Sequence, residues 1–278
     1  MSTLTRATSP TGEFGRSPLA ALIGKACRDR LQVVAAASFY MLLIGAVLGL
    51  LWPPLRDVFR ALPAGMNDLV AAISGGTNLS TPAGWANAEL LSLLAPAASI
   101  VVAVLSASSV VSEEEDKTLG LALSLPVGRG SYLVAKMAAT VILDAVVAAC
   151  VAIGLSLGNV IGDLGLTAAG IAGAAAHVLL LGLLFGALAF LLGGLTGSRR
   201  LATLIPALAA VLAFAAAVFL PLSPALVNGR LASPWYYYQR SDPLQHGASA
   251  GDLLLLGGIA VVLALGAVVA FRRRDLRG

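Results

Sequence analysis

Residues 90–111, LLSLLAPAASIVVAVLSASSVV, form a run of 22 residues without a charged side chain. A helix rises about 1.5 Å per residue, so about 20 apolar residues cross a hydrocarbon core of about 30 Å. The run therefore predicts a membrane-spanning helix. The chain then continues as SEEEDKTLGLALSLPVGRGSYLVAK at residues 112–136, which places four consecutive acidic residues directly after the apolar run.

The composition extends this prediction to the whole chain of 278 residues, of which 58% are hydrophobic and only 12% charged. A soluble domain is about 45–50% apolar and about 25% charged, so the composition is that of a membrane protein. We predict an all-α polytopic membrane protein with an N-terminal segment at 1–30, a six-helix domain at 31–271 and a basic tail at 272–278. The six expected spans are 31–52, 90–111, 134–157, 168–195, 201–222 and 252–271.

The basic residues set the expected orientation of these spans. Fourteen of the 18 Lys and Arg residues fall in segments 1–30, 112–136, 199–200 and 272–278, which alternate with the other loops. Because cytoplasmic loops carry an excess of Lys and Arg, both termini are predicted to be cytoplasmic. The wealth of Ala and Arg suggests a bacterial chain, so we expect a multi-pass protein of the bacterial cytoplasmic (inner) membrane. No basic face that would bind nucleic acid is predicted.

Aromatic residues are expected at the opposite membrane surface. Trp52 ends the first span, and WYYYQ at 235–239 lies between the fifth and sixth spans. Both are predicted to form part of an interfacial aromatic belt.

The charged segment 112–136 has the pattern of a short helix at the membrane face. Ser112 and Glu115 have the spacing of a capping box, which predicts that a new short helix, or a sharply bent continuation of the preceding helix, starts there. Leucines follow at alternate positions from Leu119 to Leu125, and Pro126 ends the segment. Such a helix could dock into a groove of another protein, or it could be an interfacial loop whose leucines enter lipid. The residues alone leave both interpretations open.

The pattern SSVVSEEEDKTLGLALSLPVGRGSYLVAK at 108–136 resembles the membrane subunit of ABC-2 type exporters. The basic stretch LAALIGKACRDR at 19–30 is similar to the interfacial N-terminal helix of that family. The resemblance implies that the loop carries the coupling helix, which contacts the ATP-binding subunit. Lys117 departs from the family pattern, which usually has a small residue there. The residues that the resemblance places at the ATPase interface are Glu113, Glu114, Glu115, Thr118, Leu119, Leu123, Pro126 and Arg129.

No nucleotide-binding motif is present in the sequence. The only Lys followed by Ser or Thr is Lys117, and the glycines of a phosphate-binding loop are missing before it. The chain is therefore not expected to be an enzyme, and no catalytic residue, metal or cofactor is predicted. The resemblance implies that ATP and Mg bind a separate ATPase, present in two copies. It also implies a second permease subunit, either identical or different, and contact with membrane lipid.

Two polar residues are predicted inside the membrane. Asp144 lies within the third span and His177 within the fourth, at comparable depths. They either face one another or a polar cavity on the substrate path, or they have a structural role. In the fourth span, Gly182 and Gly186 have the spacing that allows a close helix crossing.

Three functions are considered from the sequence. The leading prediction is the permease subunit of an ABC-2 exporter, which forms the substrate path and couples it to ATP hydrolysis. A secondary transporter is an alternative, but ionisable residues are few near the middle of the spans. A non-transporting membrane scaffold or sensor subunit is the second alternative.

Overall fold

The computed structural model of the chain describes residues 18–61, 78–115 and 128–274, and these residues form helices and no strand. Six helices, or continuous helical segments, are long and apolar enough to cross a membrane. The predicted all-α fold with six such helices is therefore confirmed. The long helices are α2 (Leu31–Ala61), α5 (Leu94–Glu115), α7 (Arg129–Gly162), α8 (Ala168–Thr196), α9 (Arg199–Phe219) and α12 (Ala250–Arg273).

Shorter helices lie before and between the long ones. Helix α4 (Pro82–Ala86) and the π-helical turn η1 (Asn87–Leu91) lead into α5. The remaining elements are α1 (Pro18–Asp29), η2 (Leu220–Leu222), η3 (Val227–Ala232), α10 (Pro234–Gln239) and α11 (Pro243–His246).

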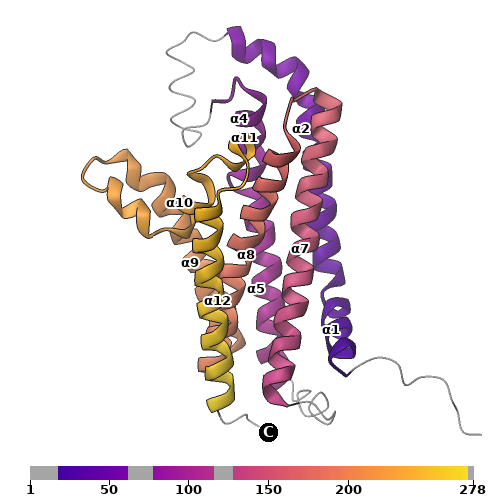
Figure 1. Cartoon of the computed structure of the whole chain (residues 1–278), viewed down its shortest axis with the longest axis vertical. Coiled ribbons are helices and arrows are strands. Elements are labelled where there is room, and N and C mark those ends of the chain that lie inside the picture. Colours follow the sequence, from indigo (N-terminus) through magenta and orange to yellow (C-terminus); the bar gives the residue numbers. More distant parts are fainter. Residues whose placement is uncertain (1–17, 62–77, 116–127, 275–278) are drawn as a thin grey trace, which may run out of the picture.

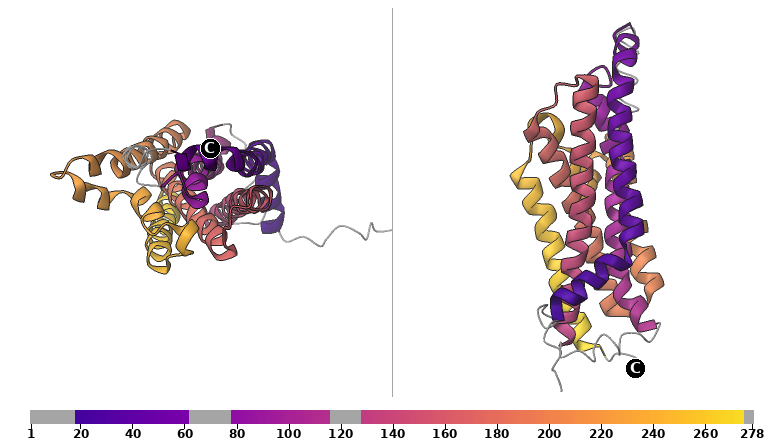
Figure 2. Two further views of the ribbon diagram at one scale, coloured as in Figure 1. Left: turned by 90° about the horizontal axis from the view of Figure 1, so that it is seen from above. Right: turned by 90° about the vertical axis from the view of Figure 1, so that its right-hand side faces the viewer.

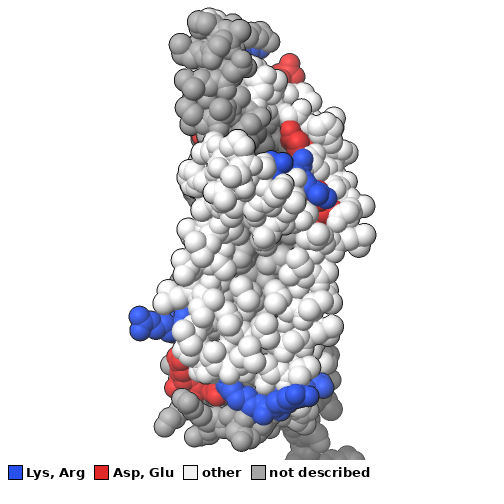
Figure 3. Space-filling view, turned by 90° about the vertical axis from the view of Figure 1, so that its left-hand side faces the viewer, with Lys and Arg blue, Asp and Glu red and all other residues white. Residues whose placement is uncertain are grey.

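The long helices form an elongated bundle with α8 at its centre (Figure 1). Helix α8 packs against α5, α7, α9 and α12, while α2 packs on the far side of α7. Helix α1 lies obliquely across the end of the bundle at which α7 begins (Figure 2, right). Charged side chains gather in a band at this end, and the face in Figure 3 is largely uncharged in the middle. We call this band the charged end. It contains residues 18–30, 113–115, 129–136, 196–200 and 272–274.

Several helices extend beyond the spans expected from the sequence. Helix α7 has 34 residues, which corresponds to about 51 Å, because its hydrogen-bonded ladder continues past the apolar residues at both ends. Helix α2 continues beyond Trp52 to Ala61, with Pro53 and Pro54 inside it. Proline removes a ladder hydrogen bond and bends a helix, and the last part of α2 leans over the bundle in Figure 1.

Glycines bring α2 and α7 into backbone contact along a seam. Gly45 and Gly49 of α2 face Gly154, Gly158 and Gly162 of α7. A Cβ atom placed on Gly154 would lie 2.5 Å from the carbonyl oxygen of Met41, which is too close for any side chain. Small residues at four-residue spacing allow this close approach of two membrane helices. The same spacing is present in the sequence of α2 and α7, although a close crossing is predicted above only for the fourth span.

The prediction of an aromatic belt is wrong for its two tryptophans. Trp52 is 3% exposed and Trp235 is 2% exposed, so both are packed inside the protein and do not lie on its surface. Trp235 contacts Phe214 of α9 with 5.2 Å between ring centroids. Nearby, the hydroxyl of Tyr238 donates to the carbonyl of Leu91 at 2.6 Å, where the π-helical turn ends. These rings attach α10 to the bundle because burial of their large apolar surface outweighs interfacial exposure.

Candidate functional site

The three glutamates predicted at the ATPase interface lie in the last turn of α5. Helix α5 continues without a break through Ser112, whose hydroxyl donates to the carbonyl of Ser108 at 3.2 Å. Ser112 therefore lies inside a helix, and the prediction that it caps the start of a new one is wrong. The apolar face of α5 remains packed against α7 and α8 up to this point, which keeps the backbone helical.

Three carboxylates at a helix C-terminus are electrostatically unfavourable. The carbonyl end of a helix carries a partial negative charge, which repels acidic side chains within the last turn. Glu113, Glu114 and Glu115, here named the glutamate cluster, therefore need positive partners. The structure supplies those partners from four other helices.

Glu113 is bound by residues of α1 and α7. Lys136 donates to its Oε1 atom at 2.7 Å, and Lys25 lies 3.6 Å from the same oxygen. The hydroxyl of Tyr132 donates to the other carboxylate oxygen. The Lys136 side chain is only 4% exposed and also lies 5.7 Å from the centroid of the Tyr132 ring. This group is mostly removed from water, so its charges depend strongly on one another.

Glu114 connects α5 to the end of α12. Its side chain, 5% exposed, forms an ion pair with Arg274, the residue that follows the last turn of α12. The same guanidinium donates to the carbonyl of Gly193 in α8 at 2.7 Å. Arg274 thus joins the ends of three helices.

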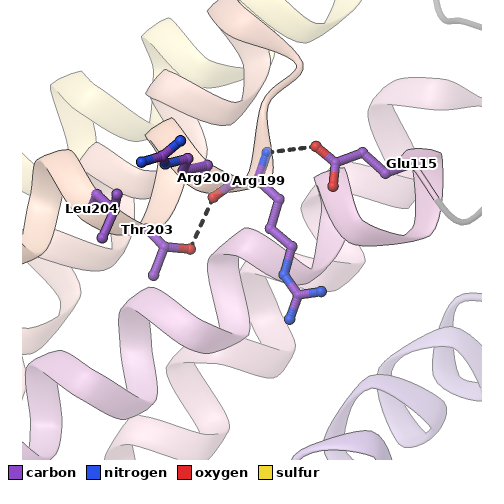
Figure 4. Close-up of a pocket in the computed structure, with 5 residues that line it drawn as sticks. All are labelled: Glu115, Arg199, Arg200, Thr203 and Leu204. Atoms are coloured by element: carbon purple, nitrogen blue, oxygen red, sulfur yellow. Dashed lines mark hydrogen bonds between the residues drawn. The ribbon is translucent and has the colours of Figure 1, made fainter.

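Glu115 binds the first turn of α9. Its Oε1 atom accepts a hydrogen bond from the backbone N–H of Arg199 at 3.0 Å, shown as a dashed line in Figure 4. The positive end of the α9 dipole and the carboxylate attract each other there. Glu115 also lines an open pocket of about 400 Å³ together with Arg199, Arg200, Thr203 and Leu204.

The glutamate cluster consequently joins five helices at the point where the chain leaves α5. Removing one partner of a buried ion pair typically costs about 3–5 kcal/mol, because the other charge is left without compensation. A displacement of the last turn of α5 would therefore be transmitted to α1, α7, α9 and α12 together. The ion pairs and hydrogen bonds of the glutamate cluster can therefore couple a movement of α5 to movements of the other four helices.

The other residues predicted at this interface are placed differently. Thr118, Leu119, Leu123 and Pro126 lie outside the described residues. Arg129 is the first residue of α7. Tyr132, Lys25 and Arg274 were not predicted as site residues. The basic character of the segments that hold Lys25 and Arg274 was visible in the sequence. Glu114 and Arg274 are 160 residues apart, however, and no local pattern reveals such a pairing.

The two predicted intramembrane residues are both fully buried, and each has its own partners. Asp144 accepts a hydrogen bond from Ser99 of α5 at 2.7 Å, and Nδ1 of His177 lies 2.8 Å from the carbonyl of Gly173. No hydrogen bond or ion pair joins Asp144 to His177 in the described part of the chain. Within that part, Oδ2 of Asp144 and Nε2 of His177 have no hydrogen-bond partner.

Gly182 and Gly186 lie where α8 crosses α5. A Cβ atom on Gly182 would overlap the hydroxyl oxygen of Ser99 in α5, and one on Gly186 would lie 3.0 Å from the Cβ of Ala103 in the same helix. Helix α8 can approach α5 this closely only because these positions carry no side chain. Among the described residues, no group of three or more His, Cys, Asp or Glu side chains could hold a metal ion.

Comparison with known families agrees with this architecture. The family described as "ABC-2 family transporter protein" matches residues 25–276. No curated protein matches the sequence. The match covers nearly all of the helical bundle, from α1 to the end of α12. The chain therefore belongs to the ABC-2 transporter family and is a permease-type, multi-pass membrane component of an ABC transporter, which implies an ATPase partner.

Proposed function

We propose that this chain is the permease subunit of an exporter and couples its substrate path to ATP hydrolysis on a separate subunit. The observation that carries the proposal is the glutamate cluster, which fixes the last turn of α5 to α1, α7, α9 and α12. The connection between α5 and α7 begins directly after this turn. A partner that pushes on the connection would therefore tilt several helices at once.

In this mechanism the charged end faces the cytoplasm of a bacterial cell. Segment 116–128 acts as the coupling segment, with Thr118, Leu119, Leu123 and Pro126 against the ATPase. The carboxylates of the glutamate cluster act within the permease and do not bind the ATPase, because Glu113 and Glu114 already form ion pairs with permease residues. ATP and Mg bind only the partner.

The assembly contains two ATPase subunits and a second permease subunit. The outward face of α9 supports the second permease, because only Ala202, Pro206 and Ala210 of this helix are buried. Leu208, Val211 and Leu212 are 58–62% exposed on it. In a paired assembly this face is covered by protein as well as lipid.

The proposal is tested by co-purification with a candidate ABC ATPase that is co-expressed with this chain. Replacing both leucines of the coupling segment, Leu119→Asp with Leu123→Asp, should abolish association, since a charged surface cannot fill an apolar groove. The matched control is Leu222→Asp with Leu226→Asp, two leucines at the opposite end of the bundle that are 71% and 54% exposed. Association that survives the first pair of changes would refute the proposed interface.

Export itself needs a second measurement. The wild-type complex in vesicles should move substrate only with ATP, and Glu115→Gln should lower transport per ATP hydrolysed without releasing the ATPase. The amide oxygen of the introduced glutamine still accepts from Arg199 but lacks the charge that attracts the α9 dipole. Transport driven by an ion gradient without any ATPase would instead support a secondary transporter.

A further inference from the structure

A narrow groove runs between α7, α8 and α12 on a side of the bundle that the glutamate cluster does not use. Its cavity measures about 210 Å³, and its walls come from all three helices. Val141 of α7 and Val261 of α12 line it and are 46% and 58% exposed, so the groove opens on the outer surface of the bundle. All three helices have the length and hydropathy of membrane spans, so the opening faces the acyl chains of the bilayer.

The lining of the groove is suited only to hydrocarbon. Thr140 is its single polar side chain, and its hydroxyl already donates to the carbonyl of Lys136 at 3.1 Å. The groove therefore offers no unpaired polar side chain to a ligand. It is also smaller than the cavities of about 300–1,000 Å³ that hold drug-sized molecules. A single flexible chain fits these properties better than a compact molecule or a helix.

A cationic side chain lies between α7 and α12 where the groove points toward the charged end. Arg272 follows the last apolar turn of α12, and its guanidinium lies over Gly130 in the first turn of α7. A Cβ atom on Gly130 would be 2.7 Å from this guanidinium. Gly130 lies about 10 Å along α7 from Met137, the groove residue nearest the charged end. That separation is comparable with the depth of the headgroup region above the hydrocarbon.

We propose that this cleft binds an anionic phospholipid, with one acyl chain in the groove and its phosphate at Arg272. The apolar lining binds the acyl chain of the lipid, and the charge of Arg272 favours an anionic headgroup over a zwitterionic one. Neither the lining of the groove nor Arg272 belongs to the glutamate cluster. The inference therefore rests on the membrane location of the chain and not on the proposed transport cycle.

The acyl-chain half of the proposal is tested by filling the groove. A Cβ atom on Gly257, which lines the groove, would meet only the side chain of Leu180, at 3.7 Å, so Gly257→Leu can fold and occupy the space. The matched control is Gly258→Leu, the adjacent position, where nothing lies within 4 Å. Native mass spectrometry of the detergent-solubilised full chain, titrated with dioleoyl-phosphatidylglycerol, measures bound lipid.

Gly257→Leu should weaken binding of this lipid at least about tenfold, because the introduced side chain displaces methylene groups of the acyl chain from the groove. Gly258→Leu should bind like the wild type. Equal binding by Gly257→Leu and the wild type, or equal losses in the two variants, would overturn the groove as the site. Thermal unfolding curves for both variants establish that the comparison is made between folded proteins.

The headgroup half is tested with Arg272→Gln and, as the control, Arg273→Gln at the next exposed position of α12. Arg272→Gln should weaken binding of dioleoyl-phosphatidylglycerol about fivefold and binding of dioleoyl-phosphatidylcholine by clearly less, because the lost charge attracts the anionic headgroup more strongly than the zwitterionic one. Arg273→Gln should alter neither lipid by as much. Equal effects of the two changes would refute a phosphate at Arg272, and equal losses for the two lipids would refute the selection of an anionic headgroup.

Discussion

Glu113 shares one carboxylate oxygen between two lysines and binds a tyrosine hydroxyl with the other. This concentration of contacts follows from its position at the negative end of α5, where an uncompensated carboxylate would be repelled. Lys136 is only 4% exposed, so Glu113 supplies the opposite charge that offsets the desolvation of its ammonium group. The pair is therefore strongly interdependent.

Glu113→Gln should lower the free energy of unfolding by about 3–5 kcal/mol, because it leaves the charge of Lys136 buried without its anion. Adding Lys136→Met should restore most of the loss. Thermal unfolding in detergent measures both effects. The control is Glu89→Gln, which changes an exposed glutamate elsewhere and should have little effect. A double variant no more stable than Glu113→Gln alone would contradict the interdependence.

We predict a structural role for Asp144. Asp144→Asn keeps an oxygen that accepts from Ser99, so folding and ATP-driven transport should both stay near wild-type levels. Loss of transport in a variant that unfolds at the wild-type temperature would instead place Asp144 on the substrate path. The sequence indicated that an aspartate lies in the membrane, but its partner on α5 is 45 residues away and could not be read from spacing.

At the scale of helices, the seam between α2 and α7 is the closest contact described above. Gly45 and Gly158 touch through backbone atoms, so no side chain separates the two helices at this crossing. Packing of this kind holds membrane helices together because close approach maximises dispersion contacts. A methyl group there would have no space to enter.

Gly158→Val should destabilise the folded protein by about 3 kcal/mol or more, since the added atoms would overlap the backbone of Gly45. The fraction that elutes as a monodisperse peak in size-exclusion chromatography, followed with temperature, reports the loss. Gly258→Val is the matched control, because that glycine has no atom within 4 Å of its added Cβ. Comparable behaviour of the two variants would disprove the importance of the seam.

The elements were largely predictable from sequence, and their contacts were not. Runs of about 20 apolar residues identify membrane helices because backbone groups in lipid must bond within the helix. The same rule does not show which helix faces which neighbour. It also missed the burial of Trp52 and Trp235, since an aromatic residue near a span end suits either an interface or a core. The capping-box pattern at Ser112 failed because local spacing competes with the packing of the whole α5 helix.

For the whole molecule, the charged end defines an orientation that can be measured. In a background with Cys27→Ala and Cys150→Ala, Asn228→Cys at the opposite end should react with a membrane-impermeant maleimide in intact cells. Gly120→Cys, in the coupling segment, should react only after the cells are permeabilised, because the positive-inside rule places that segment in the cytoplasm. The reverse pattern would invert the proposed topology and with it the location of the ATPase.

The contact of α2 with α7 also restricts how this protein can change shape. Two backbones in direct contact have no intervening rotamers to rearrange, so these helices must travel as a single rigid body. Helix α9, by contrast, buries only three of its own side chains and is held at its start by the carboxylate of Glu115. We therefore expect α2 and α7 to move together as one unit during a transport cycle, while α9 can shift relative to that unit.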